Sequence, residues 1–220
     1  IVDNDIIFSE YIEKYVKDKE KELSPSCMEA YKNEVKIIKQ YFGKKLKLKD
    51  VTYRHIEEFY DYLKNARGVK NSTVKHYSVV LSPALRLAYR DDLIPKNPYE
   101  FIPRIKREKP PRNYYNKEEL EKLFEYTDKT NLALIVRFAA YYGVRRSELL
   151  GLRWQSIDFV NKTLTIEHKI LIADSMIYKT NTLKTESSNR TLPLLPTIEK
   201  LLLDRKKEIE HNKIIYGMCY

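Results

Sequence analysis

A proline-rich basic segment near the middle of the chain divides the sequence into two parts of different character. Residues 103–112 read PRIKREKPPR, with three prolines and five basic residues against one acid, and they show no helical period. Proline fixes its own φ and biases the preceding residue towards extended backbone, so a continuous helix cannot run through this segment. We therefore expect a semi-rigid linker between two small domains, residues 1–102 and 113–220, in this chain of 220 residues.

The first part has the pattern of a bundle of amphipathic helices. Apolar residues recur at steps of three and four, which places them on one face of a helix. Four residues with capping side chains are expected to begin helices: Ser9, Ser24, Thr52 and Ser72. Pro25 suits the first turn of the second helix, Gly43 its C-cap, and Pro83 falls inside the fourth helix. The prediction is a small all-helical domain.

The second part mixes helical and β patterns. Asn116 and Glu119 have the spacing of a capping box, and Leu132–Tyr142 is apolar nearly all round, which predicts a buried helix. A short helix is expected around Ser147–Leu150. Three β-like stretches follow at residues 163–167, 176–178 and 190–194, and Pro196 then opens a charged helix. The predicted fold class is mainly α with a small β-sheet, the second domain being α+β.

The composition excludes several classes of protein. None of the five glycines is spaced as in GxGxxG or a P-loop, which argues against dinucleotide and NTPase folds. Two cysteines (Cys27 and Cys219) and four histidines without ligand spacing predict neither a disulfide framework nor a metal site. We expect no cofactor, no membrane span and a reducing, cytoplasmic setting.

The charge balance points to a polyanionic partner. The net charge is +10, with 23 basic against 17 acidic residues up to Pro111 and 18 against 14 beyond it. Both parts therefore carry an excess of positive charge, so neither is a simple basic tail. Such a distribution favours binding to nucleic acid.

Two polar groupings in the second part could carry chemistry. Arg145 and Glu148 lie three residues apart on the short helix, where a guanidinium held by a carboxylate is preorganised to bind an anion. A purely structural ion pair is the alternative. Lys184 is expected at the tip of a hairpin between the second and third β-like stretches, with Thr185 and Ser188 beside it. Hydroxyls next to Lys and Arg suit phosphate contacts, although a solvated turn is equally natural.

Taken together, the two groupings resemble the tyrosine recombinase family of phage and conjugative-transposon integrases. The matching residues are GVRRSELLGLRWQSID, from Gly143, and KTxxSxR, from Lys184, ahead of LPL. The resemblance covers nearly the whole chain. It implies that Arg145 and Lys184 are catalytic, that Glu148 supports Arg145, and that the first domain is a SAM-like core-binding domain which grips DNA opposite the catalytic domain.

The resemblance also implies a reaction and an assembly. A tyrosine attacks one phosphodiester to leave a 3′-phosphotyrosine, Arg145 stabilises the charge that develops, and Lys184 protonates the leaving 5′-oxygen. Neither metal nor cofactor is needed. The partners implied are double-stranded DNA, four copies of the protein on two duplexes, and an accessory directionality factor.

The sequence departs from the family where the remaining catalytic residues are expected. No His-x-x-Arg box follows Lys184, since His211 has no arginine three residues on, and no tyrosine follows such a box. The chain also begins at Ile1 without a methionine. We therefore expect a fragment truncated before the second box, inactive alone. Tyr220 as the nucleophile is the disfavoured alternative.

Basic and polar side chains in both domains are the candidate DNA contacts. Hydroxyls and amides at a helix N-terminus can donate to phosphate, and lysines on one helix face can neutralise it. The candidates are Lys32, Lys36, Lys70, Ser72, Thr73, Lys75, His76, Arg86, Arg90, Lys106, Arg107, Arg146, Thr185, Ser188 and Arg190. For any single lysine, a solvated helix face is the competing reading. Two other functions stay open: a DNA-binding protein without catalysis, and a helical scaffold for protein or RNA partners.

Overall fold

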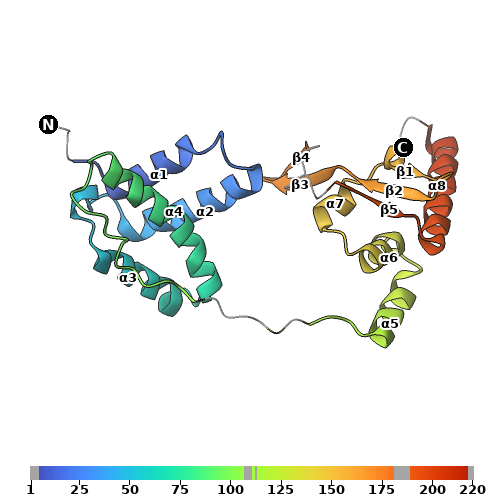
Figure 1. The fold of residues 1–220 in the computed structure, drawn as a ribbon, viewed down its shortest axis with the longest axis horizontal. Coiled ribbons are helices and arrows are strands. Elements are labelled where there is room, and N and C mark those ends of the chain that lie inside the picture. Colours follow the sequence, from blue (N-terminus) through green and yellow to red (C-terminus); the bar gives the residue numbers. More distant parts are fainter. Residues whose placement is uncertain (1–4, 107–110, 112, 181–188, 218–220) are drawn as a thin grey trace. The chain divides into compact units, whose positions relative to one another are not determined.

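The computed structural model describes residues 5–106, 111, 113–180 and 189–217, and it divides into two compact units. Unit 1 spans Ile1–Pro111 and unit 2 spans Arg112–Tyr220 (Figure 1). Unit 1 is helical and unit 2 combines helices with two small antiparallel sheets. The predicted fold class, mainly α with a small β content, is confirmed.

Unit 1 packs its helices around one apolar core. Its elements are α1 (Phe8–Asp18), α2 (Pro25–Phe42), the 3₁₀ turn η1 (Leu48–Asp50), α3 (Tyr53–Asp61), the π-helical turn η2 (Tyr62–Ala66) and α4 (Asn71–Arg90). Phe8, Ile38 and Phe59 are fully buried, and α1 contacts both α2 and α4. Ile105, within the segment predicted as the linker, also packs against this core. The first residues of that segment therefore belong to unit 1.

Local capping chemistry explains where these helices begin and end. Ser24 caps α2 by accepting a hydrogen bond from the backbone N–H of Cys27, as predicted. Gly43 ends α2 with φ +62°, a left-handed value that favours glycine. The capping role predicted for Ser9 is wrong, because Ser9 lies inside α1 and donates to the Gly43 carbonyl at 2.7 Å. Ser72 is likewise the second residue of α4, whose N-cap is Lys70.

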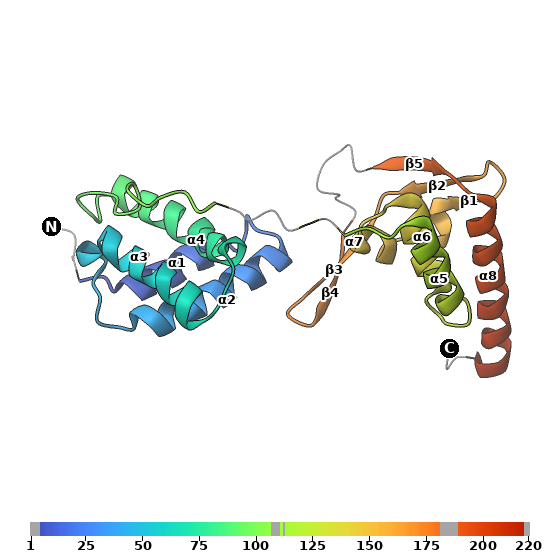
Figure 2. The same cartoon turned by 90° about the horizontal axis from the view of Figure 1, so that it is seen from below.

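In the described part of unit 2, three helices and a 3₁₀ turn come first, five strands follow, and one long helix comes last. The helices are α5 (Lys117–Thr127), α6 (Ala133–Tyr142), α7 (Arg146–Leu150), the 3₁₀ turn η3 (Trp154–Ser156) and α8 (Pro196–Tyr216). The strands are β1 (Ile157–Asp158), β2 (Thr163–Ile166), β3 (Lys169–Ala173), β4 (Met176–Thr180) and β5 (Arg190–Pro193). The sheet β1–β2–β5 carries core residues such as Leu164 and Ile166, whereas β3 and β4 form a hairpin that projects away from it (Figure 2).

The strand register corrects the predicted hairpin around Lys184. Ile166 pairs with Arg190 and Lys169 pairs with Thr180, so among the described residues β5 pairs with β2, and β4 pairs with β3. The hairpin closes instead at Asp174 and Ser175, both with positive φ, although neither is a glycine. Lys184, Thr185 and Ser188 lie outside the described residues, on the connection between β4 and β5.

The helix predicted at Leu132–Tyr142 is confirmed as α6, but the prediction that it is buried is wrong. Phe138 is the residue of α6 that is buried, while Ile135 and Tyr141 are exposed. One side of α6 packs against α5, α7 and α8, and this leaves apolar side chains on its other side exposed. The capping box of Asn116 and Glu119 at the start of α5 is confirmed, with both reciprocal hydrogen bonds at 2.9 Å.

Candidate active site

A buried carboxylate at the start of α7 organises two arginines. Glu148, whose side chain is 3% exposed, accepts from Arg145 Nη1 at 2.7 Å through Oε1. Its Oε2 accepts from the backbone N–H of Arg145 at 3.1 Å and from Arg190 Nη2 at 3.0 Å. The sequence spacing predicted the first ion pair. It gave no sign of the second, because Arg190 is 42 residues away along the chain.

The local backbone explains why these groups meet. Gly143 ends α6 in the left-handed conformation, with φ +59°, and Arg145 is then extended as the N-cap of α7. Glu148 occupies the N3 position, from which its carboxylate reaches back to the N-cap N–H as in a capping box. At the other end of α7, a Cβ on Gly151 would lie 2.6 Å from the His168 carbonyl oxygen. The absence of a side chain at Gly151 therefore allows α7 to lie against β3.

The electrostatics of the group keep Glu148 ionised. Burial raises the pKa of this carboxyl, but the hydrogen bonds from Arg190 and Arg145 together outweigh burial and lower its pKa to about 2. The Arg145 side chain is 70% exposed even though Nη1 is held by Glu148. An oriented and accessible guanidinium of this kind can bind a phosphate oxygen.

Strand pairing fixes the residues on either side of the segment with Lys184. Thr180 is paired with Lys169, and Arg190 is paired with Ile166 and bound to Glu148. The C-terminal end of the segment is therefore anchored next to the carboxylate that also holds Arg145. Within the described residues, no group of three or more His, Cys, Asp and Glu side chains could hold a metal ion.

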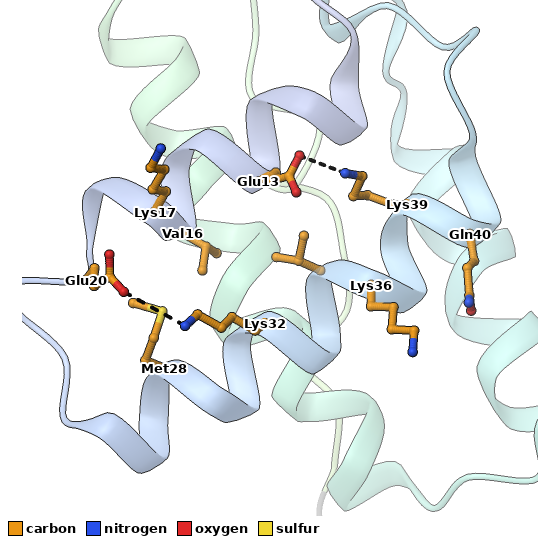
Figure 3. A pocket seen from close by; sticks show the side chains of 10 residues that line it. Glu13, Val16, Lys17, Glu20, Met28, Lys32, Lys36, Lys39 and Gln40 are labelled. Carbon is orange, nitrogen blue, oxygen red and sulfur yellow. Dashed lines mark hydrogen bonds and ion pairs between the residues drawn. The ribbon is translucent and has the colours of Figure 1, made fainter. Parts of the chain in front are cut away.

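The candidate lysines on α2 differ in their ion pairing. Lys32 lies 3.8 Å from Glu20 (Figure 3). Lys39, which is one helical turn beyond Lys36, donates to Glu13 at 2.7 Å. One of these carboxylates lies in α1 and the other in the turn that follows it. The two ion pairs offset part of the charge of these two lysines. Lys36 carries no such ion pair in the part of the chain that the structure describes. Of these three lysines, Lys36 is therefore the best placed to bind an external phosphate.

The other candidate DNA contacts are distributed over both units. At the start of α4, Lys70, Ser72, Thr73 and His76 are exposed and Lys75 is half-buried; Arg86, Lys106 and Arg146 are also exposed. Arg90 is exposed and pairs with Asp91 at 3.1 Å. Arg107 lies outside the described residues. Among the described helices, none has the length and apolar character needed to cross a membrane.

Comparison with known proteins defines the class. Residues 7–109 match the phage integrase SAM-like domain, and residues 113–216 match the phage integrase family. The chain belongs to this family of tyrosine recombinases. The resemblance inferred from the two sequence motifs is therefore confirmed.

Individual relatives come from prophages and transposons. The prophage integrase IntR of Escherichia coli K12 is 26% identical over 94% of this chain and 52% of its own length. The transposase of transposon Tn916 from Enterococcus faecalis is 27% identical over 64% of this chain and 37% of its own length. The chain thus spans about half the length, or less, of these relatives.

Solved structures share the fold. The Tn1549 transposon integrase in complex with a circular intermediate DNA superposes with a TM-score of 0.79 at 18% identity, covering 92% of this chain and 65% of that one. A lambda integrase tetramer bound to a Holliday junction gives a TM-score of 0.69 at 20% identity, covering 94% and 58%.

Proposed function

We propose that this chain is the DNA-gripping part and the first portion of the catalytic part of a site-specific recombinase, which integrates or excises a mobile element. The observation that carries the proposal is the Arg145–Glu148–Arg190 group, in which a buried carboxylate orients two guanidiniums. Family membership supports it, because the relatives include prophage and transposon enzymes. Unit 1 then serves as the core-binding domain, and the part of segment 103–112 that follows Ile105 serves as the linker.

The proposed reaction is a transesterification. A tyrosine oxygen loses its proton to water and forms a bond to the scissile phosphorus, the bond from phosphorus to the 5′-oxygen breaks, and Lys184 delivers a proton to that oxygen. Arg145 binds a non-bridging oxygen, on which negative charge increases in the transition state. Glu148 positions Arg145, and Arg190 contacts the phosphate backbone from β5 while it shares the same carboxylate. Strand exchange reverses these steps and conserves the phosphodiester.

The proposed partner is double-stranded DNA, with four copies of the protein on two duplexes. The lambda integrase tetramer on a Holliday junction supports this arrangement by its shared fold. An accessory directionality factor is a further partner that the family resemblance implies. A protein acting on DNA in this way would work in the cytoplasm of a bacterial cell.

A covalent-adduct assay tests whether the chain acts alone. The 220-residue chain is incubated with a nicked duplex that traps the phosphotyrosine, and the products are separated under denaturing conditions. We expect DNA binding without adduct, because the nucleophile belongs to a later part of the family's sequence. An adduct that disappears in Tyr220→Phe would make Tyr220 the nucleophile and refute our assignment.

The catalytic role of Arg145 is tested in the full-length protein that carries this sequence. Arg145→Ala should lower the cleavage rate by at least about a hundredfold, the usual cost of removing one transition-state donor, with DNA affinity close to wild type. Arg146→Ala is the matched control, since Arg146 is exposed on the same helix: it should weaken binding and leave the rate at saturating DNA unchanged. A large loss of affinity in Arg145→Ala would reassign Arg145 to binding.

A further inference from the structure

Unit 1 holds a buried acid in a groove lined by basic, polar and apolar side chains. The groove has a volume of about 670 Å³ and lies between α2 and the first half of α4. Its lining includes Asn33, Lys36, Gln40, Arg67, Thr73 and His76. Glu34, which also lines it, is only 8% exposed.

The Glu34 carboxylate is poorly satisfied. Its Oε2 is buried and has no hydrogen-bond partner among the described residues, and its Oε1 lies 3.9 Å from His76 Nδ1, beyond hydrogen-bond distance. A buried charge without a hydrogen bond is costly, so burial raises the pKa of Glu34 to about 7. Near neutral pH the carboxyl therefore changes between its neutral and ionised forms.

Among the titratable groups that face one another in the groove, Glu34 is the carboxylic acid. His76 and Tyr77 face it from α4, Arg67 from the residue after η2, and Tyr31 and Lys36 from α2 itself. Burial raises the pKa of both tyrosines, so they are neutral at pH 7. Among these groups, ionisation of Glu34 is thus what introduces negative charge into the groove.

We propose that DNA binding by unit 1 is coupled to protonation of Glu34, so that the duplex binds more tightly when this carboxyl is neutral. Lys36, Thr73 and His76 line the same groove and belong to the proposed DNA contacts, which places phosphate close to the carboxyl. A phosphate disfavours the ionised carboxyl by like-charge repulsion. Linkage is reciprocal, so if protonation favours DNA, then DNA binding must draw a proton onto Glu34. The inference rests on the proposed DNA-binding function of unit 1.

The sign and size of the effect follow from this charge change. Affinity should be highest below pH 7 and should fall as the pH rises and Glu34 ionises. One added negative charge within several ångströms of a phosphate, in a partly solvated groove, corresponds to roughly fivefold weaker binding at pH 8 than at pH 6.

The experiment measures DNA affinity as a function of pH. Binding of the full chain to a fluorescently labelled 30-base-pair duplex is followed by anisotropy from pH 6 to 8 at constant ionic strength. Glu34→Gln should bind tightly throughout and lose most of the pH dependence. Glu29→Gln, which removes the same charge from the same helix outside the groove, should keep the wild-type dependence.

A second variant separates the contribution of Glu34 from that of the nearby histidine. His76→Gln should bind more weakly and retain the pH dependence. If the dependence persists in Glu34→Gln and is lost in His76→Gln, the histidine is responsible and the proposal is wrong. Calorimetry at pH 7 in buffers of different ionisation enthalpy tests the wild-type chain without relying on a variant, because net proton uptake on DNA binding is expected and zero uptake would overturn the coupling.

Different binding results would refute this inference and the proposed function. Binding that is tight, sensitive to salt and independent of pH would refute the coupling and leave DNA binding intact. If no binding to duplex is found at any pH in low salt, both are refuted.

Discussion

Replacing Glu148 by Gln tests whether this carboxylate stabilises the two-arginine group as the geometry indicates. Its pKa is lowered from 4.5 to about 2, so the fold favours the ionised form by about 3 kcal/mol, at about 1.4 kcal/mol per pKa unit. Gln keeps the shape but loses the charge, and because its amide nitrogen cannot accept a hydrogen bond, one of the two arginines loses its acceptor. We expect unit 2 to lose about 2–3 kcal/mol of unfolding free energy.

The measurement is urea unfolding of unit 2, followed by the fluorescence of Trp154, the single tryptophan of the chain. Trp154 lies in η3, between α7 and β1, so its signal reports on the unit that contains Glu148. Glu208→Gln is the control, because its pair with Arg205 is exposed and should contribute less than about 1 kcal/mol.

The pH dependence gives a second, independent check. A carboxyl whose pKa is lower in the folded state stabilises the fold above its unfolded pKa, and this stabilisation is lost as the pH falls through the folded value. The difference between wild type and Glu148→Gln should therefore be constant above about pH 5 and shrink between pH 4.5 and about 2. A difference no larger than that of Glu208→Gln, or one that does not shrink in acid, would refute the reasoning.

Two further predictions concern packing and DNA contact. Gly151→Ala should lower the melting temperature of unit 2 markedly, because a Cβ 2.6 Å from the His168 carbonyl oxygen forces α7 or β3 to move. An unchanged melting curve by circular dichroism would contradict this prediction. Lys36→Ala should weaken duplex binding and reduce the slope of log affinity against log salt by about one. Lys39→Ala should have a smaller effect, because Glu13 offsets the charge of Lys39. Equal slopes for the two variants in anisotropy titrations would show that the ion pair is irrelevant.

The sequence predicted the features that depend on local patterns. The helices of unit 1 follow from apolar spacing and from residues such as Ser24 and Gly43, whose capping roles depend on their immediate neighbours. The Arg145–Glu148 pair was predictable from its spacing of three residues, although Arg145 is the extended N-cap of α7 and the contact is that of a capping box. Ser9 was misassigned because a serine at a helix start can also hydrogen-bond elsewhere, here to Gly43.

Features that depend on distant partners were not predictable in this way. The contact between Arg190 and Glu148 arises from the pairing of β5 with β2, which no local pattern specifies. The β3–β4 hairpin was missed because its turn uses Asp174 and Ser175, and sequence rules look for glycine where φ is positive. The exposure of α6 depends on which faces its neighbours cover, and its own sequence is apolar nearly all round.

The separate pairing of β4 and β5 has an evolutionary consequence. Thr180 of β4 pairs with Lys169 in one sheet and Arg190 of β5 pairs with Ile166 in the other, so the chain between the two strands can gain or lose residues without shifting either set of pairs. Insertions there would leave Arg145, Glu148 and Arg190 in place. Related enzymes can thus differ in the length of this connection, and exchanging it between relatives is a direct way to vary the segment that carries the proposed catalytic lysine.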